Sequence, residues 1–238
     1  MGRRFLNRLL VFILGFWAFL ELGGVLQVAL STLVSLAVYA LAFGFNFAIG
    51  FMALLFVHEM GHIIASRVVG LRASGPMFIP FIGAVVRLNK IPVNSKMAAN
   101  IAIGGPAAGV VSALVCFVFY LWTDSLLMLV LSYVACILNL FNLIPCAPLD
   151  GEHIAAAISH RLMWVGSLVI GLIFVYTHNI LIFIIFVFSL IQLWKWRSFG
   201  NKEDSSLTRR QRLTVAWWYF GILAVLSVLT WYIMEFLP

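Results

Sequence analysis

Charged residues are scarce in this sequence. Asp, Glu, Lys and Arg together make up only 10% of its 238 residues, whereas about 25% of an average soluble domain is charged. Hydrophobic residues make up 64%, and apolar runs of about 20 residues, the length that crosses a bilayer, recur along the chain. This lack of charge excludes an ordinary water-soluble protein and indicates an integral membrane protein.

Cysteines are few, and a signal-peptide cleavage site is lacking. The cysteines number only three, and two of them, Cys116 and Cys136, fall inside apolar runs, so we expect packing residues rather than a disulfide framework. The first apolar run ends in "ELGG", which is a poor match to a small-residue cleavage site. We therefore expect a retained first membrane span instead of a cleaved signal peptide.

Hydropathy predicts an all-α polytopic membrane protein with about six to seven transmembrane helices, forming a single integral membrane domain over residues 1–238. The last span, 213–235, is an additional C-terminal helix. The predicted spans lie at residues 5–29, 34–66, 98–122, 126–145, 162–177, 180–195 and 213–235.

The stretch at residues 71–97 does not fit a membrane span. Prolines, glycines and basic residues interrupt it, and "FIGAVVRLN" places β-branched residues beside a glycine. Such a pattern is typical of a short strand or hairpin. We expect a β-hairpin or a re-entrant segment here, at the membrane surface or folded back beside the site.

The fifteen Lys and Arg residues test this division into spans. With a cytoplasmic N-terminus, all of them fall on or near the cytoplasmic side, including those of a basic cytoplasmic loop at 196–212. This asymmetry is what the positive-inside rule requires. The net charge of +7 then faces anionic headgroups of the lipid bilayer, and no nucleic-acid partner is expected.

The stretch "FVHEMGHIIASR" puts ionisable side chains into one of the most apolar parts of the chain. Such residues cost about 2.5–3.5 kcal/mol each on insertion scales and are candidates for function. His58 and His62 project from the same face of a helix, while Glu59 points about 100° away and can hold a proton near a metal-bound water. This H-E-x-x-H pattern is that of zinc hydrolases; a pair of pore-lining histidines is the alternative interpretation.

A third protein ligand is needed, because catalytic zinc sites usually combine three protein ligands with one water. The best candidate is Asp150 in "NLFNLIPCAPLDGEH", at the same predicted depth as His62. Two prolines in this stretch would break the helix and let Asp150 turn inward. Glu152 and His153 are the next candidates, and Cys146 is a more distant one. Asp150 is alternatively the N-cap of a helix that begins near Glu152.

At this point the motifs resemble those of the site-2 protease family of intramembrane zinc metalloproteases. The residues that carry the resemblance are "HEMGH" at 58–62, "NLIPCAPLDG" at 142–151, and "GGPAAG" at 104–109 between them. The resemblance covers about residues 34–160, the expected catalytic core, and no PDZ or CBS domain is recognised, as in a minimal member. Two positions depart from the family pattern: Gly109, where an asparagine often follows the G-P element, and Glu152, where many relatives have glycine.

The resemblance implies a role for each of six residues. One zinc ion would be held by His58, His62 and Asp150, with Glu59 as the general base. Asn142 would hold the substrate or the developing oxyanion, although a polar contact between helices is its alternative role. A strand near Gly83 would pair with the unwound substrate.

The implied reaction is hydrolysis of peptide bonds within or near transmembrane segments of substrate proteins. A membrane-held anti-sigma factor or a signal-peptide remnant would fit as substrate, in the cell membrane of a bacterium or archaeon, with the active site toward the cytoplasm. Two alternatives stay open: a divalent-metal transporter, which would tolerate changes at Glu59, and a non-catalytic membrane-protein binder of the same fold. His153, His160 and His178 have no assigned role and are expected at surface or headgroup positions.

Overall fold

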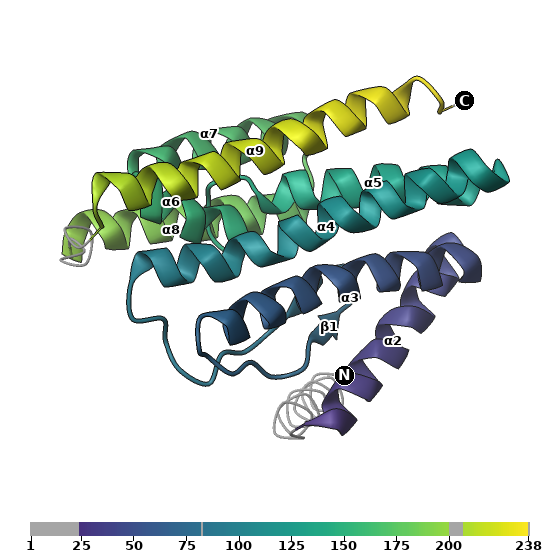
Figure 1. Ribbon diagram of the computed structural model, residues 1–238, viewed down its shortest axis with the longest axis horizontal. Helices are drawn as coiled ribbons and strands as arrows, with labels where there is room; N and C mark the ends of the chain where they lie inside the picture. Colours follow the sequence, from purple (N-terminus) through teal and green to yellow (C-terminus); the bar gives the residue numbers. More distant parts are fainter. Residues whose placement is uncertain (1–23, 82, 200–206, 238) are drawn as a thin grey trace, which may run out of the picture.

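The computed structural model describes residues 24–81, 83–199 and 207–237. It is mostly helical and contains one small antiparallel sheet (Figure 1), so the predicted helical fold with a short hairpin is confirmed. The described elements are α2 Val25–Phe43, α3 Phe45–Val68, β1 Met77–Ile79, β2 Gly83–Val85, α4 Ser95–Thr123, α5 Leu126–Asn142, α6 Asp150–Ile158, α7 Arg161–Thr177, α8 Ile180–Phe199 and α9 Arg209–Met234.

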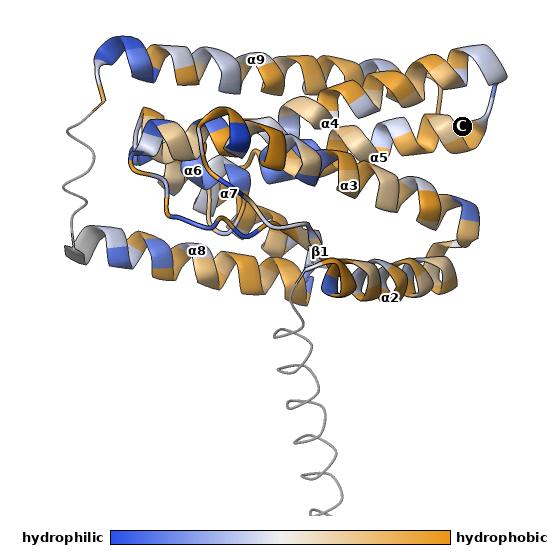
Figure 2. Cartoon of the chain, turned by 60° about the horizontal axis from the view of Figure 1, so that its bottom comes forward, coloured by the Kyte–Doolittle hydropathy of each residue, from blue (hydrophilic) through white to orange (hydrophobic). Residues whose placement is uncertain are grey.

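Most of these helices are suited to a membrane. Helices α2, α3, α4 and α9 are long and apolar enough to cross one, and α5, α7 and residues 180–196 of α8 are shorter apolar helices. Figure 2 shows α2, α8 and α9 apolar along most of their length, with hydrophilic residues gathered where α8 stops and α9 starts. The chain is a multi-pass membrane protein.

The helices pack as a bundle around α4. Helix α4 lies between α3 on one side and α5 and α9 on the other (Figure 1), and α6 packs against both α4 and α9. The largest group of buried apolar residues comes mainly from α4, α5, α6 and α9 and includes Leu129, Ile154 and Leu226. Helix α9, the additional helix of the sequence prediction, is therefore part of the main core.

Five predicted spans coincide with helices, but within the described residues the boundary predicted at 30–33, between the first two spans, is wrong. Residues 5–23 of the first predicted span lie outside the described residues. Between 24 and 68, the chain breaks at Gly44, whose φ of 89° suits glycine, rather than at 30–33. Ser31 and Thr32 lie inside α2, where their hydroxyls donate to the Val28 carbonyl at 3.0 and 2.7 Å, so these polar groups are satisfied within the helix. The polar residues at 31–32 therefore do not separate two spans.

The predicted hairpin is present. Strands β1 and β2 pair antiparallel, with Met77 opposite Val85 and Ile79 opposite Gly83. Helix α2 holds the hairpin: the Ser31 hydroxyl accepts a hydrogen bond from the backbone N–H of Phe78 at 3.2 Å, and the Tyr39 hydroxyl accepts one from the backbone N–H of Phe81 at 2.9 Å. Side chains of α2 thereby satisfy backbone donors of β1 and of the turn that follows it.

Two smaller predictions need correction. Helix α6 begins at Asp150 itself with Leu149 as its N-cap, so Asp150 lies in the first turn and is not the cap. His160 is buried, at 6% exposed, and stacks face to face on Trp196 with ring centroids 4.7 Å apart, so its predicted surface position is wrong. His153 is exposed, as expected.

Candidate metal centre

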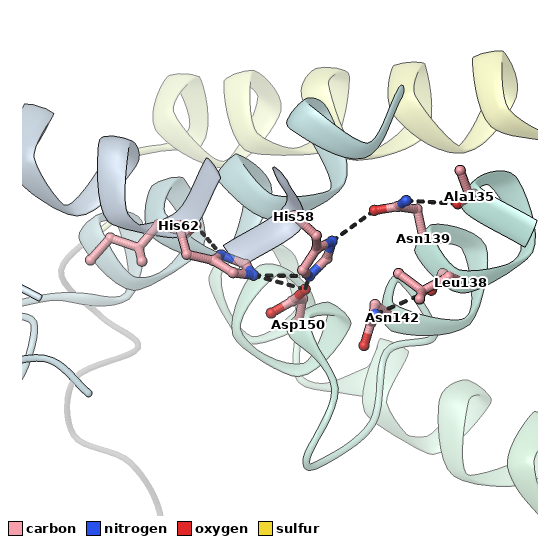
Figure 3. Close-up of polar contacts among 8 residues, drawn as sticks. His58, His62, Ala135, Leu138, Asn139, Asn142 and Asp150 are labelled. Atoms are coloured by element: carbon pink, nitrogen blue, oxygen red, sulfur yellow. Dashed lines mark hydrogen bonds and ion pairs between the residues drawn. The ribbon is translucent and has the colours of Figure 1, made fainter. Parts of the chain in front are cut away.

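Three residues of the H-E-x-x-H motif are buried in the second half of α3. His58, Glu59 and His62 are 3%, 6% and 9% exposed. The spacing of four residues places both imidazoles on one helix face, with ring centroids 4.8 Å apart. After α5 ends, residues 143–149 fold back, so that Asp150, the first residue of α6, meets the imidazole pair (Figure 3). The structure thus brings the three predicted metal ligands together.

The ligand atoms form a nearly equilateral triangle. The two Nε2 atoms of His58 and His62 are 3.1 Å apart, and Oδ2 of Asp150 lies 3.2 Å from Nε2 of His58 and 3.3 Å from Nε2 of His62. A tetrahedral zinc ion with bonds of about 2.0–2.1 Å separates its ligand atoms by about 3.3 Å. The three atoms therefore already have the spacing that a tetrahedral ion requires.

Hydrogen bonds on the far side of each ring set the histidine tautomers. Nδ2 of Asn139 donates to the Ala135 carbonyl at 2.7 Å, so its amide oxygen faces Nδ1 of His58 at 2.8 Å. An amide oxygen can only accept, and Nδ1 of His58 must carry the proton. Nδ1 of His62 likewise donates to the backbone carbonyl of Ile101 at 2.9 Å. Both Nε2 atoms are left with a lone pair.

The electrostatics of the triangle follow from these tautomers. Two imidazole lone pairs and a carboxylate oxygen converge within 3.3 Å, and in the absence of a shared positive charge they repel one another. Within the described residues, His58, His62 and Asp150 are the group that could hold a metal ion. Nitrogen and carboxylate ligands with both rings oriented by hydrogen bonds match the donor set of zinc.

Glycines of α4 make the space for this centre. At Gly61 and Gly104 a Cβ atom on either residue would strike the backbone carbonyl of the other, so α3 and α4 touch along their backbones. A Cβ at Gly105 would meet Nε2 of His62 and would lie 2.8 Å from Nε2 of His58. The expected close approach of helices around "GGPAAG" is present, and Gly105 faces the ligand atoms directly.

The other predicted site residues lie outside the triangle. Glu59 is buried beside His58, and no described residue hydrogen-bonds to its carboxylate. Asn142, the last residue of α5, is half-buried and donates from Nδ2 to the Leu138 carbonyl at 3.1 Å. Gly83 begins β2 with a φ of 120° and open space beside its Cα. The roles of Glu59, Asn142 and Gly83 stay predictions.

The remaining candidate ligands point elsewhere. The Glu152 carboxylate accepts a hydrogen bond from Gln192 of α8 at 3.0 Å, and His153 is exposed. Cys146 is buried in an apolar cluster with Leu149 and Ile170. None of these joins the metal-binding group within the described residues.

Asn139 is the residue near the metal centre that the sequence analysis missed. It is 2% exposed, and it precedes Asn142 by three residues in a mostly apolar helix. A second asparagine one turn from a motif residue, inside a membrane span, was the available signal, since buried polar groups in a membrane need partners.

Comparisons with known proteins cover part of the chain, including the motif at 58–62. The sequence model of peptidase family M50 matches residues 46–126. A zinc metalloprotease from Methanocaldococcus jannaschii is 33% identical over 114 residues, which cover 44% of this chain and 33% of that protein. The chain thus spans about a third of the length of this curated relative.

A solved structure gives a weaker likeness. A site-2 protease from Methanocaldococcus jannaschii aligns with 74% of this chain and 88% of its own, at 21% identity and a TM-score of 0.47. The family match and the curated relative agree with the resemblance stated from the motifs: residues 46–126, which contain "HEMGH" and "GGPAAG", match peptidase family M50, the site-2 proteases.

Proposed function

We propose that this chain is an intramembrane zinc metalloprotease that hydrolyses peptide bonds within or near transmembrane segments of other proteins. The observation that carries the proposal is the triangle of His58, His62 and Asp150, whose lone pairs converge at the spacing of a tetrahedral ion inside a membrane bundle. The relationship to peptidase family M50 supports the same reaction class.

His58, His62 and Asp150 would hold one zinc ion. When bound, zinc supplies Lewis-acid activation of a water molecule and of the scissile carbonyl. Glu59 adjoins His58 on α3, is buried, and is engaged by no described hydrogen-bond donor, which leaves its carboxylate available to a proton. In the proposed reaction Glu59 takes the proton of the attacking water and delivers it to the leaving amine.

Asn142 is proposed to steady the substrate carbonyl as charge develops on its oxygen. One N–H of its amide is used by the Leu138 carbonyl. A side-chain amide has two N–H donors, so the second one can serve the oxyanion. This role requires Asn142 to remain at the C-terminal end of α5, one turn from Asn139 and next to the segment that leads to Asp150.

The substrate strand is proposed to pair with β2. A helical transmembrane segment must unwind before its backbone can be cut, and an extended segment can add to an open sheet edge. Ser31 and Tyr39 of α2 bond to β1 and its turn, whereas among the described residues no such contact covers the outer edge of β2. Gly83, with open space beside it, would begin the free edge.

The proposed setting is the cell membrane of a bacterium or archaeon, with N-terminus and active site toward the cytoplasm. Arg67 lies in the last turn of α3, just beyond His62, and four further basic residues occur between 72 and 96. Basic residues at this end of the site fit the cytoplasmic side. An anti-sigma factor or a signal-peptide remnant is the proposed kind of substrate.

The first test is Glu59→Gln, which keeps the shape of the side chain but removes its basicity. We expect it to abolish cleavage and to leave zinc content unchanged, as measured by comparing membrane-protein fragments and by metal analysis of the purified protein. The matched control is Glu152→Gln on α6, which should retain both. A Glu59→Gln variant that cleaves at the native rate would contradict the proposed mechanism.

A zinc-transport measurement in sealed vesicles and the fragment comparison together separate the two alternatives. A metal transporter would carry zinc across sealed vesicles and would tolerate Glu59→Gln. A non-catalytic binder would show the same fragment pattern in the native chain and in the variant. Neither alternative requires a buried carboxylate beside the ligand pair, and the position of Glu59 therefore favours hydrolysis.

A further inference from the structure

Asn139 has a connection to the metal centre that its place in an apolar helix does not suggest. Burying an amide costs free energy unless its polar atoms find partners. Both ends of the Asn139 amide are engaged, Nδ2 by the Ala135 carbonyl at 2.7 Å and Oδ1 by Nδ1 of His58 at 2.8 Å (Figure 3). We infer that Asn139 is a positioning residue of the metal centre, which fixes the tautomer and ring orientation of His58.

The direction of the hydrogen bond is determined by the rest of the network. If the amide were turned over, its oxygen would face the Ala135 carbonyl and two acceptors would meet. In the observed orientation the amide oxygen accepts the proton of Nδ1, and Nε2 of His58 presents its lone pair to the ligand triangle. A His58 ring with its proton on Nε2 could not bind a metal through that atom.

Gly109 on α4 provides the room for this contact. A Cβ atom at position 109 would overlap the side-chain amide of Asn139. The amide therefore occupies the volume that any larger residue at 109 would fill. The missing side chain at Gly109 of α4 thus leaves the space in which Asn139 of α5 places the acceptor for His58.

The expected consequence is a change in metal affinity. Without an acceptor at Nδ1, His58 distributes between two tautomers and its ring is less constrained. Loss of such a supporting hydrogen bond typically costs about 10- to 100-fold in metal affinity or activity. The inference rests on the ligand set of the proposed function, but zinc binding can be measured without any substrate.

The experiment uses the full chain, purified in detergent, stripped with a chelator and titrated with zinc in competition with a zinc-binding dye. Asn139→Leu keeps a similar volume but has no acceptor, and we expect its Kd for zinc to rise about 10- to 100-fold. Asn139→Asp retains an oxygen that accepts from Nδ1 of His58, but its second oxygen can donate to the Ala135 carbonyl only when protonated. We therefore expect its Kd for zinc to lie closer to that of the native chain than the Kd of Asn139→Leu does.

Ser132→Ala is the matched control. Ser132 lies on the same helix two turns earlier, is fully buried, and donates to the Ala113 carbonyl of α4 at 2.7 Å. The variant therefore also loses a buried hydrogen bond between α5 and α4 but keeps the contact with His58. We expect the thermal stability of the protein to fall and its Kd for zinc to stay unchanged.

A second variant, Gly109→Ala, tests this packing contact without altering Asn139 or His58. In Gly109→Ala the added Cβ displaces the Asn139 amide, and zinc binding should weaken as in Asn139→Leu. Native affinity in both Asn139→Leu and Gly109→Ala would overturn the inference. Equal losses in Asn139→Leu, Asn139→Asp and Ser132→Ala would overturn it too, because they would reflect packing alone.

The outcomes for Asn139 and for the proposed function are distinguishable. A native chain that binds zinc tightly, with Glu59→Gln cleaving at the native rate, contradicts the protease mechanism and leaves the Asn139 result standing. Unchanged zinc affinity in the Asn139 and Gly109 variants, with cleavage lost in Glu59→Gln, contradicts only the role of Asn139. A native chain that binds no zinc overturns both.

Discussion

His58 and His62 come from the interior of one continuous helix, whereas Asp150 follows a break in the chain at residues 143–149. On the helical side, the distance between the two imidazoles is largely set by helix geometry, and α4 needs only to leave space for them at Gly105. On the side of the break, Asp150 begins the short helix α6, and its position depends on how α6 and residues 143–149 pack against other helices. The two sides of the metal centre are therefore positioned by different kinds of contact.

Three helices hold the segment that carries Asp150. Its first carbonyl, at Leu143, accepts a hydrogen bond from the Tyr219 hydroxyl of α9 at 2.7 Å. Gly151 of α6 packs against the carbonyls at the start of the segment, and Gly166 of α7 packs against the Pro145 carbonyl. His58 and His62 are therefore placed by the geometry of one helix, closely packed against α4. The position of Asp150 depends on contacts with helices that are distant in the sequence.

The largest effect is expected on the helical side. Gly105→Ala places a methyl group against Nε2 of His62 and Nε2 of His58, in the space where a metal would be bound. Because both imidazoles must move, we expect the Kd for zinc to rise by more than about 100-fold, beyond the range for supporting residues, with loss of cleavage. Zinc competition in detergent measures the first and fragment analysis the second.

Gly221→Ala on α9 is the control for this substitution. It has the same change in chemistry and in helix propensity, but no atom lies within 4 Å of the added Cβ. We expect zinc binding and cleavage to be those of the native chain. Native zinc affinity in Gly105→Ala would show that the ligand atoms are not where the proposed centre requires them.

Gly166→Ala, which acts on the segment before Asp150, is expected to have a smaller but still large effect on zinc affinity. The added methyl group meets the Pro145 carbonyl and lies 3.0 Å from the backbone N of Cys146. Backbone cannot yield as a flexible side chain can, so the segment must shift and take Asp150 with it. We expect a loss of about 10- to 100-fold in zinc affinity, measured by the same competition.

Gly171→Ala lies on the same helix and separates this effect from a general change in α7. The three atoms nearest its added Cβ belong to the ring of Phe186, the closest at 2.9 Å, and a side chain can move aside. We expect nearly native zinc affinity. Equal losses in Gly166→Ala and Gly171→Ala would mean that α7 acts on the site through its overall packing and not through the segment at 143–149.

The contrast between the two sides also explains what the sequence could predict. The motif at 58–62 is contiguous, so helical periodicity alone places His58, Glu59 and His62 in their correct relation. Asp150 could be proposed because few acidic residues lie at a suitable depth and prolines precede it. Its actual position depends on contacts between distant segments, which no local pattern contains.

Other features were beyond the sequence for the same reason. Asn139 and Gly109 are complementary only once α4 and α5 are packed together. His160 was expected at a surface or headgroup position, yet it is buried and stacks on Trp196, 36 positions along the chain. Gly44 was missed as a break because apolar residues on both sides of a turn leave hydropathy unchanged. The helical fold and the position of the hairpin, in contrast, follow from composition along the chain.

The smallest effect is expected from Tyr219→Phe on α9, which removes one hydroxyl and leaves the aromatic ring in place. The Leu143 carbonyl, at the start of the segment that leads to Asp150, then loses its partner among the described residues. Hydrogen bonds between membrane helices average about 0.6 kcal/mol and reach about 1.7 kcal/mol, so we expect a modest drop in stability on thermal unfolding. Because Asp150 depends on this segment, zinc affinity should fall as well, by less than about 10-fold.

Tyr232→Phe is the matched control, since Tyr232 lies on the same helix and its ring packs against Phe117 and Phe236. Its hydroxyl makes no hydrogen bond within the described residues, and the variant should match the native chain in both measurements. If Tyr219→Phe lowered stability but left zinc affinity unchanged, α9 would support the bundle without positioning Asp150. A fall in both stability and zinc affinity would show that α9 helps to position Asp150, because the position of this ligand depends on the contacts that hold residues 143–149.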